Sequence, residues 1–343
     1  MTLTQPTQVI RYERTLGMTV MIGKGFYAPN DMSFAPNGRI YVLNRSIEAR
    51  ASGQGMRVTV CGANDEYYGF FGAFGSGRGE FMWPSAIAVG LDNRVFLADE
   101  HLQKIMIFSS EGDFIDEWGT TGSRPGELDT PSGIAIYGEG NLLVSDTYNH
   151  RIQAFTSDGE FIKTFGEEGA AEGELNMPWR LSIGPDSNIY VADWGNDRVS
   201  IFTQDGEFLS SFGESGTGEG QFTKPADVVS DGNGNIYVCD WGNERVQILD
   251  SNGEFRQLTL GESTVSPWAK NFLDVNVEEG EARSRANLDM DDIEFPDPND
   301  RHIVSAHIEK YFWAPMALAI SPDNRLYVTE SNRHRIQIFE ILG

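Results

Sequence analysis

Cysteine is scarce in this sequence: Cys61 and Cys239 are the only two among 343 residues. Two cysteines cannot build a framework of several disulfides, and these two fall in different repeat units, so we expect free thiols. Long apolar runs are absent, because no stretch approaches the roughly 20 residues that span a bilayer. Residues 1–10 (MTLTQPTQVI) have neither the basic start nor the apolar run of a signal peptide. We therefore expect a cytoplasmic protein without a membrane segment.

Positive charge is also in short supply. Lys and Arg number 26 against 51 Asp and Glu, which gives a formal net charge of −25. Nucleic-acid binding relies on basic side chains that displace counterions from phosphates, and anionic membrane surfaces attract basic segments. We expect neither partner. The acidic field favours a cationic or metal partner, although acidity that serves only solubility explains the charge as well.

A repeat with a fixed period dominates what is present. Two series of residues recur at intervals of 47: Pro84, Pro131, Pro178 and Pro225, and Asp99, Asp146, Asp193 and Asp240. Weaker copies occupy residues 29–44 and 315–330, which makes six units. Within a unit, short β-branched and aromatic runs alternate with Gly, Asn and Asp, as in four successive strands. A period of 40 to 50 with four strands per unit predicts the blades of a β-propeller.

We predict an all-β, six-bladed propeller that forms one domain over residues 1–343. The blades are expected at residues 29–72, 84–119, 131–166, 178–213, 225–260 and 312–341. The last of them lacks its fourth strand. Residues 8–17 resemble the outer strands of the other units, so we expect the N-terminus to complete the last blade and to leave no exposed seam.

An insertion separates the fifth and sixth units, where Pro315 comes 43 residues later than the period predicts. We place it at 263–310, with short helices at 268–273, 278–286 and 302–311. A long connection is typically a lid, a binding loop or a disordered excursion, and the aromatic residues in this one favour an ordered lid. Its acidic residues Asp289, Asp291 and Asp292 lack the spacing of an EF-hand, and a solvated loop explains them as well as calcium does.

Chain direction places the loops after each second strand and the links between blades on one face. The fourth residue after each blade acid lies in those loops, in a rough circle of Glu48, Gln103, His150, Asp197, Glu244 and His334. Histidine and carboxylates suit a divalent metal, so His150, His334, Asp197 and Glu244 are candidate ligands. The alternative is that these side chains only make local contacts.

The residues that follow each blade proline point toward the channel. Arg180 stands out because its counterparts in three other blades are Ala86, Gly133 and Ala317. Its role is either to anchor a carboxylate or developing oxyanion, or to pair with Asp31 or Asp227. The candidate catalytic residues are Arg180, His150, Asp31 and Asp227.

Aromatic side chains are expected on the same face. Trp179, Trp194, Trp241 and Tyr148 are candidate substrate-binding residues that would wall a pocket for an apolar or cationic ligand. Packing between blades is the alternative.

Residues 146–155 (DTYNHRIQAF) resemble the NHL-repeat consensus, as do 193–202, 240–249 and 330–339. The resemblance implies a six-bladed propeller. The chain is also distantly similar to the amidating lyases that act on peptidyl-hydroxyglycine and to calcium-dependent lactonases. The zinc site of the lyases takes one His from an Asp-x-x-x-His loop, which His150 and His334 match. It takes others from a Pro-His start of a blade, which nothing here matches. A lactonase-like calcium site would draw on Asn30, Asp31, Asp227, Asp197 and Glu244.

These observations predict an enzyme or small-molecule binder with its site in a lidded central funnel. The reaction class we favour is a lyase or hydrolase assisted by a divalent metal, calcium or zinc. There is no organic cofactor motif and no Ser-His-Asp or Cys-His arrangement. The alternative is a protein-interaction scaffold without catalytic activity.

Overall fold

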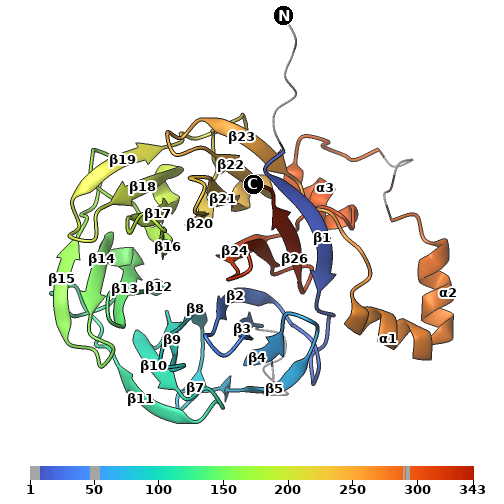
Figure 1. Ribbon diagram of the computed structural model, residues 1–343, viewed down its shortest axis with the longest axis horizontal. Helices are drawn as coiled ribbons and strands as arrows, with labels where there is room; N and C mark the ends of the chain where they lie inside the picture. Colours follow the sequence, from blue (N-terminus) through green and yellow to red (C-terminus); the bar gives the residue numbers. More distant parts are fainter. Residues whose placement is uncertain (1–7, 47–54, 289, 291–293) are drawn as a thin grey trace, which may run out of the picture.

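The computed structural model describes residues 8–46, 55–288, 290 and 294–343. Six antiparallel four-stranded sheets surround a central axis, and each is one blade (Figure 1). The predicted all-β, six-bladed architecture is confirmed. No helix among the described residues is long and apolar enough to cross a membrane. Cys61 and Cys239 are both buried free thiols.

Four blades run in sequence order from the innermost to the outermost strand and follow the repeat closely. Blade two contains β8 (Pro84–Val89), β9 (Val95–Asp99), β10 (Lys104–Phe108) and β11 (Phe114–Trp118), and blade three contains β12 (Pro131–Tyr137), β13 (Asn141–Asp146), β14 (Arg151–Phe155) and β15 (Phe161–Phe165). Blade four contains β16 (Pro178–Ile183), β17 (Ile189–Asp193), β18 (Arg198–Phe202) and β19 (Phe208–Phe212). Blade five contains β20 (Pro225–Ser230), β21 (Ile236–Asp240), β22 (Arg245–Leu249) and β23 (Phe255–Thr259).

The first and last blades are less regular. Blade one contains β2 (Pro29–Phe34), β3 (Arg39–Arg45), β4 (Met56–Gly62) and β5 (Tyr67–Phe71), followed by the short parallel pair β6 (Ala73–Phe74) and β7 (Glu80–Phe81). Blade six contains β24 (Pro315–Ile320), β25 (Arg325–Glu330) and β26 (Arg335–Ile341), completed by β1 (Ile10–Leu16). The pairing runs from Ile10 opposite Ile341 to Leu16 opposite Ile336. The N-terminal strand therefore closes the ring, as predicted.

The hydrophobic core lies between blades. Each of six buried clusters combines residues of two neighbouring sheets. A repeated glycine shows how close the packing is. Gly206, in the turn between the third and fourth strands of blade four, has φ of 88°, and a Cβ there would meet the Phe165 ring of the preceding blade at 2.8 Å. Gly112, Gly159 and Gly253 meet Phe71, Trp118 and Phe212 in the same way.

The repeated acidic and arginine residues fix the links between blades. In blade four, Asp193 is fully buried, and its Oδ2 accepts from Arg198 Nε at 2.8 Å. Its Oδ1 accepts from the backbone N–H of Asn176 in the preceding link, and the Arg198 terminal nitrogens donate to carbonyls of that link. Asp146 with Arg151 and Asp240 with Arg245 repeat the arrangement. The motif is thus a structural connection between link and blade.

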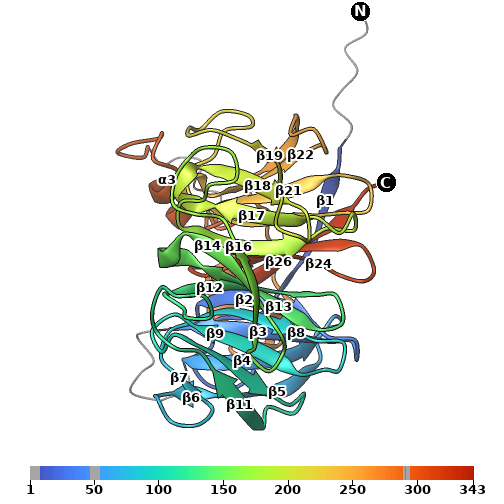
Figure 2. The same cartoon turned by 90° about the vertical axis from the view of Figure 1, so that its left-hand side faces the viewer.

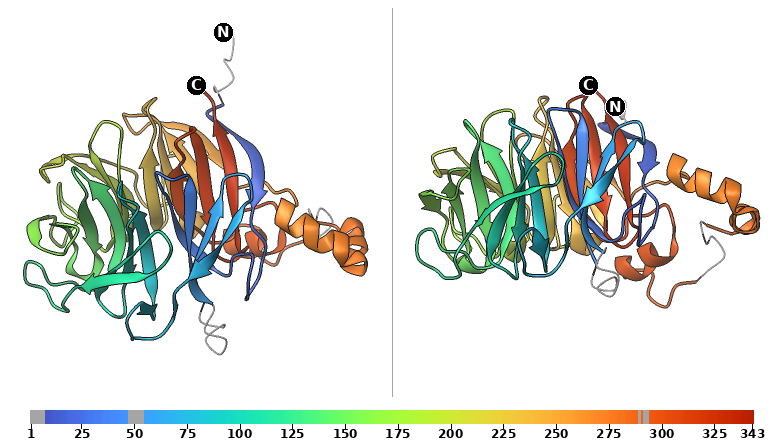
Figure 3. Two further views of the ribbon diagram at one scale, coloured as in Figure 1. Left: turned by 60° about the horizontal axis from the view of Figure 1, so that its bottom comes forward. Right: turned by 90° about the horizontal axis from the view of Figure 1, so that it is seen from below.

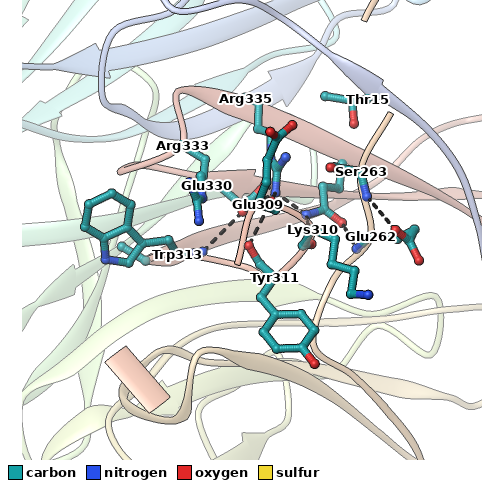
Figure 4. A network of polar contacts seen from close by, with 12 residues as sticks. Thr15, Glu262, Ser263, Glu309, Lys310, Tyr311, Trp313, Glu330, Arg333 and Arg335 are labelled. Atoms are coloured by element: carbon teal, nitrogen blue, oxygen red, sulfur yellow. Dashed lines mark hydrogen bonds and ion pairs between the residues drawn. The ribbon is translucent and has the colours of Figure 1, made fainter. Parts of the chain in front are cut away.

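Blade six builds the same connection with Glu330 and Arg335. Figure 4 shows this ion pair beside the link that precedes β24. The Trp313 backbone N–H donates to Glu330, and Arg335 donates to the carbonyls of Glu309 and Tyr311. The connection therefore holds the end of the long insertion against the last blade.

The insertion contains the predicted short helices, α1 (Pro267–Val275), α2 (Val277–Arg285) and α3 (Arg301–His307). Helix α1 starts at Ser266, whose side chain caps the Ala269 N–H, with Pro267 in the first turn. The helices α1 and α2 lie beside the ring, outside β1 (Figures 1 and 3). Figure 2 shows the molecule from the opposite edge of the disc, with α3 at one of the two faces of the disc.

The position of the insertion differs from the lid expected from its place in the chain. Trp268 is 2% exposed and packs against Phe26 and Tyr67, and its Nε1 donates to the Asp65 carbonyl at 2.8 Å. This buried indole ties α1 to the seam between blades six and one. Only α3 reaches the face that carries the second-to-third-strand loops, where it contacts Trp241–Asn243 of blade five.

Candidate functional site

A cavity of about 320 Å³ lies on the propeller axis. All six innermost strands line it, and the lining residues come mainly from the second halves of these strands: 31–34, 87–89, 134–136, 180–183, 227, 229 and 318–320. We call the side where each innermost strand ends in a tight turn the turn face, and the side with the links between blades the loop face. The cavity therefore extends from the middle of the channel toward the turn face.

Arg180 closes the channel on the loop-face side. Its side chain starts at β16 in blade four and crosses the axis. Nη1 donates to the Met316 carbonyl at 2.7 Å, and Nη2 donates to the carbonyls of Asn30 and Ser85, each at 2.9 Å. These acceptors belong to blades six, one and two, and Arg180 is only 3% exposed. The guanidinium is thus a bridge across the ring.

The room for Arg180 depends on a small neighbour in blade three. A Cβ added to Gly133 would lie 2.9 Å from the Arg180 Cα and 2.7 Å from the Trp179 carbonyl oxygen, closer than real Cβ atoms approach. The glycine at this blade position therefore lets the Arg180 backbone approach the axis.

Two carboxyl groups flank the Arg180 side of the cavity. Asp31 and Asp227 occupy equivalent positions in blades one and five. The oxygens of Asp31 accept from the backbone N–H groups of Met32 and Ile87, at 2.8 and 2.9 Å. Those of Asp227 accept from Val228 and Leu318, at 2.8 and 2.7 Å. Each aspartate thus connects its own strand to the next blade.

The electrostatics of these groups are unusual. Arg180 Nε lies 3.7 Å from Asp31 Oδ2, beyond hydrogen-bond distance, and it has no hydrogen-bond partner. Burial raises the pKa of Asp31, against the opposing effect of Arg180. Burial raises the pKa of Asp227 to about 7, and the Asp31 charge adds to this while Arg180 opposes it. A pKa near 7 is in the range that suits a general acid or base at neutral pH.

The candidate metal ligands have a different role. His150 Nδ1 accepts from the Met177 backbone N–H at 3.1 Å, and His334 Nδ1 accepts from Ala28 at 2.8 Å. Three further side chains at this blade position also accept from the residue before the next blade proline: Gln103 from Thr130, Asp197 from Lys224 and Glu244 from Ala314. All five acceptor residues have left-handed φ values between 51° and 56°. The position joins neighbouring blades and favours residues that tolerate this conformation.

A metal centre therefore has no support from these side chains. Among the residues that the structure describes, no three His, Cys, Asp or Glu side chains gather closely enough to hold a metal ion. Glu48, Asp289, Asp291 and Asp292 lie outside the described residues. The structure brings Arg180, Asp31 and Asp227 together at the central cavity. It leaves His150 and His334 among the inter-blade links, away from the cavity lining.

The candidate aromatic residues lie on the loop face, and none lines the central cavity. Trp179 and Trp194 are 6.0 Å apart with their rings inclined by 30°, and the Lys224 ammonium lies 4.3 Å from the Trp194 ring. Trp179 and Trp241 pack against the core between blades five and six. Tyr148 is 56% exposed. Packing between blades therefore accounts for Trp179 and Trp241.

The structure adds features that the sequence did not indicate. His302 of α3 lies 2.6 Å from the Glu244 carboxylate, and burial raises the pKa of Glu244 to about 7. A second cavity of about 940 Å³ lies within the insertion, with Val265, Leu273 and the Arg283–Glu309 ion pair on its walls. These contacts depend on where α1 and α3 dock, which the repeat pattern does not encode.

Two known families match parts of this sequence. The NHL-repeat family matches residues 128–155 and 312–339, and a family described as a six-bladed β-propeller matches residues 180–260. No curated protein matches the sequence.

Solved structures resemble the whole ring at low sequence identity. A catalytically inactive virginiamycin B lyase from Staphylococcus aureus with quinupristin has a TM-score of 0.57 and 12% identity, and the match covers 97% of this chain and 100% of the lyase. A structural genomics protein of unknown function from Bacteroides thetaiotaomicron has a TM-score of 0.58 and 16% identity over 94% and 71% of the two chains. A chain of the nidogen/laminin complex has a TM-score of 0.51 and 17% identity over 69% and 82%. Likeness at this level establishes the fold alone. With the repeat matches, it identifies the chain as a six-bladed β-propeller of the NHL-repeat type.

Proposed function

We propose that the protein binds a small molecule in its central cavity and exchanges a proton with it through Asp227. One observation carries the proposal: Arg180, Asp31 and Asp227 converge on a cavity of about 320 Å³. The equivalent positions in the other three blades are the small residues Ala86, Gly133 and Ala317. Polar groups on apolar walls, with a carboxyl group that titrates in the neutral range, are typical of a binding or catalytic site.

The chemistry available is acid–base chemistry. Asp227 is ionised in part of the molecules and protonated in the rest near pH 7, so it can accept a proton from one ligand atom and return it to another. Lyases and hydrolases both need such steps. The proposal involves no metal. His150, Asp197, Glu244 and His334 are engaged in the inter-blade links, and the oxygens of Asp31 and Asp227 already accept backbone hydrogen bonds.

The test is a fragment screen by ligand-observed NMR on the full chain and on Ile136→Trp. Ile136 lines the cavity at the end of β12, near the turn face, so an indole there narrows the entrance. We expect fragments that bind the wild type with millimolar affinity to lose binding to this variant. Because Ile136 also packs against the core between blades two and three, cooperative melting of the variant is the control for its fold. Fragments that bind both proteins equally would place the site elsewhere and defeat the proposal.

A second candidate function is that of an interaction scaffold, and one observation favours it. The helices α1 and α2 expose apolar side chains beside the ring, with Phe272 at 42%, Val277 at 61% and Val275 at 80%. Replacing these three residues by Ser should leave fragment binding in the cavity unchanged. If the substitutions abolish fragment binding in the cavity, the insertion affects the cavity and is not a separate interaction surface.

A further inference from the structure

We propose that the central cavity takes a small organic cation, a primary ammonium on a short apolar body, and that this cation replaces a proton bound by the Asp31–Asp227 pair. The inference rests on the proposed function, since it names the class of ligand for the same cavity. The argument uses the charge balance of the cavity, its walls and its single open end.

The charge balance leaves one carboxylate without a partner. Two carboxyl groups face one guanidinium, and Arg180 directs three of its hydrogen bonds to the carbonyls of Asn30, Ser85 and Met316 rather than to either aspartate. Its nearest approach to a carboxylate is 3.7 Å, to Asp31. With both aspartates ionised, the site carries one excess negative charge, which a proton or a cation must balance in a buried position.

The carboxylates keep room for a donor. Each of the four oxygens of Asp31 and Asp227 accepts one backbone hydrogen bond. An ionised carboxylate offers about four acceptor sites, so about two remain on each aspartate. An ammonium group carries three N–H donors and no acceptor, which fits this set.

The walls favour an organic cation over a metal ion. Apart from the charged groups and the hydroxyls of Ser33 and Ser182, the lining is mostly apolar, with Ile134, Leu181 and Ile320 among its members. Both hydroxyls form hydrogen bonds with backbone groups of the cavity wall: Ser33 accepts from the Val89 N–H, and Ser182 donates to the Val228 carbonyl. Apolar side chains stabilise an apolar body, and they add no oxygen ligand to the two carboxylates for a bare ion such as calcium, which needs six or more.

An anionic ligand fits poorly. Nη1 and Nη2 of Arg180 donate to three carbonyls, so an anion would meet only the remaining Nε donor and would face two carboxyl groups. The approach of a cation is favoured instead. Because Arg180 blocks the loop face, entry is from the turn face, and the net charge of −25 attracts cations toward the whole molecule.

Proton exchange gives the binding a defined pH dependence. Burial raises the pKa of Asp227 to about 7, so below pH 7 the free cavity holds a proton at this carboxyl. The cation and the proton compete for one negative charge. Affinity should therefore fall by up to tenfold for each pH unit below about 7, and it should level off above that value.

The experiment is isothermal titration calorimetry of the full chain between pH 5.5 and 8.5. The probes are butylammonium and benzylammonium chloride, matched with 1-butanol and benzyl alcohol, and sodium and calcium chloride as ions without an apolar body. We expect the ammonium probes to bind, each with release of up to one proton near pH 6.5, as read from buffers of different ionisation enthalpy, whereas proton uptake would contradict the exchange. The alcohols and the inorganic ions should bind at least tenfold more weakly.

Two variants locate the effect. Asp227→Asn should weaken ammonium binding at pH 8 by tenfold or more and remove the pH dependence. Asp205→Asn, on an exposed turn of the turn face with a side chain 93% exposed, should change neither. If Asp227→Asn fails to fold, the pH series on the wild type still decides the inference.

Four outcomes overturn the inference in distinguishable ways. Equal binding of alcohols and ammonium probes, lost in Ile136→Trp, removes the cation and keeps the cavity site. Tighter binding of calcium than of the ammonium probes replaces the organic cation with a metal. Ammonium binding without pH dependence would rule out the exchange with the proton. If no ammonium probe binds, the cavity does not take this class of ligand. The fragment screen decides separately whether the cavity binds any small molecule.

Discussion

Arg180 of blade four donates a hydrogen bond across the propeller axis to the carbonyl oxygen of Met316 in blade six, at 2.7 Å. From the sequence, this arginine was expected to hold a substrate anion, with an ion pair to Asp31 or Asp227 as the alternative. Its position supports the ion pair with Asp31, since Nε lies 3.7 Å from Asp31 Oδ2, while its hydrogen bonds go to three backbone carbonyls. It divides the channel into an aromatic-rich loop face and a separate cavity that reaches the turn face.

Replacement of Arg180 by Ala should destabilise the protein rather than only affect binding. The substitution removes three hydrogen bonds and leaves the buried carbonyls of Asn30, Ser85 and Met316 without this donor. We expect a loss of about 2–4 kcal/mol in the free energy of unfolding, measured by urea denaturation. Arg124→Ala is the control, since that side chain is 85% exposed and should cost less than about 0.5 kcal/mol. Equal stability of the two variants would show that the bridge across the axis contributes little.

Asp193→Asn tests the connection between link and blade. The change keeps an acceptor for the Asn176 N–H but removes the charge that Arg198 Nε faces at 2.8 Å in a buried position. Breaking one side of a buried ion pair costs about 3–5 kcal/mol. Thermal melting followed by circular dichroism should show a clear decrease, whereas Asp205→Asn on an exposed turn should melt like the wild type. A small effect at Asp193 would mean that the link carbonyls alone hold Arg198.

Blade one contains a natural counterpart of that substitution. Asn44 pairs in register with Arg57, and it accepts from the Tyr27 N–H as the aspartates do in other blades. Arg57 still donates to three link carbonyls, but its Nε has no partner. The repeat thus tolerates the loss of one carboxylate where the remaining contacts persist.

The architecture was predictable because it follows from local chemistry repeated six times. Alternating strands, Asp-Gly turns and the period of 47 residues require no knowledge of distant contacts. The closure of the ring was also visible, since residues 8–17 resemble an outer strand and the last unit lacks one.

The functional positions were less predictable because one residue type serves several purposes. His150 and His334 fit a metal site by type, yet each accepts a backbone N–H from the following blade link. A hint was present in the sequence, since Gln103 occupies the same position and is no typical metal ligand. The position of the insertion depends on long-range contacts that no local pattern encodes, among them the burial of Trp268 at the seam and the contact of His302 with Glu244.

Deletion of residues 1–17 should open the ring. The deletion removes β1 and exposes the edge of β26, from Ile336 to Ile341, together with the seam that Trp268 covers. Unpaired edges associate with one another, so we expect aggregation and loss of cooperative melting, checked by size-exclusion chromatography and circular dichroism. A monomeric truncated protein with an unchanged melting curve would contradict the role of this strand in closing the ring.

The last prediction concerns the pH dependence of stability. Burial raises the pKa of Asp227 to about 7 in the folded protein, against an ordinary value of 3.8. A carboxyl group whose pKa is higher in the folded than in the unfolded state binds more protons when folded, so its contribution to stability is largest below about pH 4 and is lost as the pH rises through 7. Between pH 5 and pH 8 the wild type should therefore lose about 2 kcal/mol of stability through this group, at about 1.4 kcal/mol per pH unit.

Asp227→Asn removes that titration, so the difference in unfolding free energy between variant and wild type should shift in favour of the variant as the pH rises from 5 to 8. The slope from Glu244, another buried carboxyl group with a raised pKa, has the same sign in both proteins and cancels in the comparison, whereas Asp31, whose charge interacts with that of Asp227, is part of the titration that the variant changes. The measurement is urea denaturation of both proteins at four pH values, with Asp205→Asn as the exposed control. A difference that stays constant across this range, or moves in favour of the wild type, would mean that Asp227 keeps an ordinary pKa, and the acid–base role proposed for the central cavity would then lose its basis.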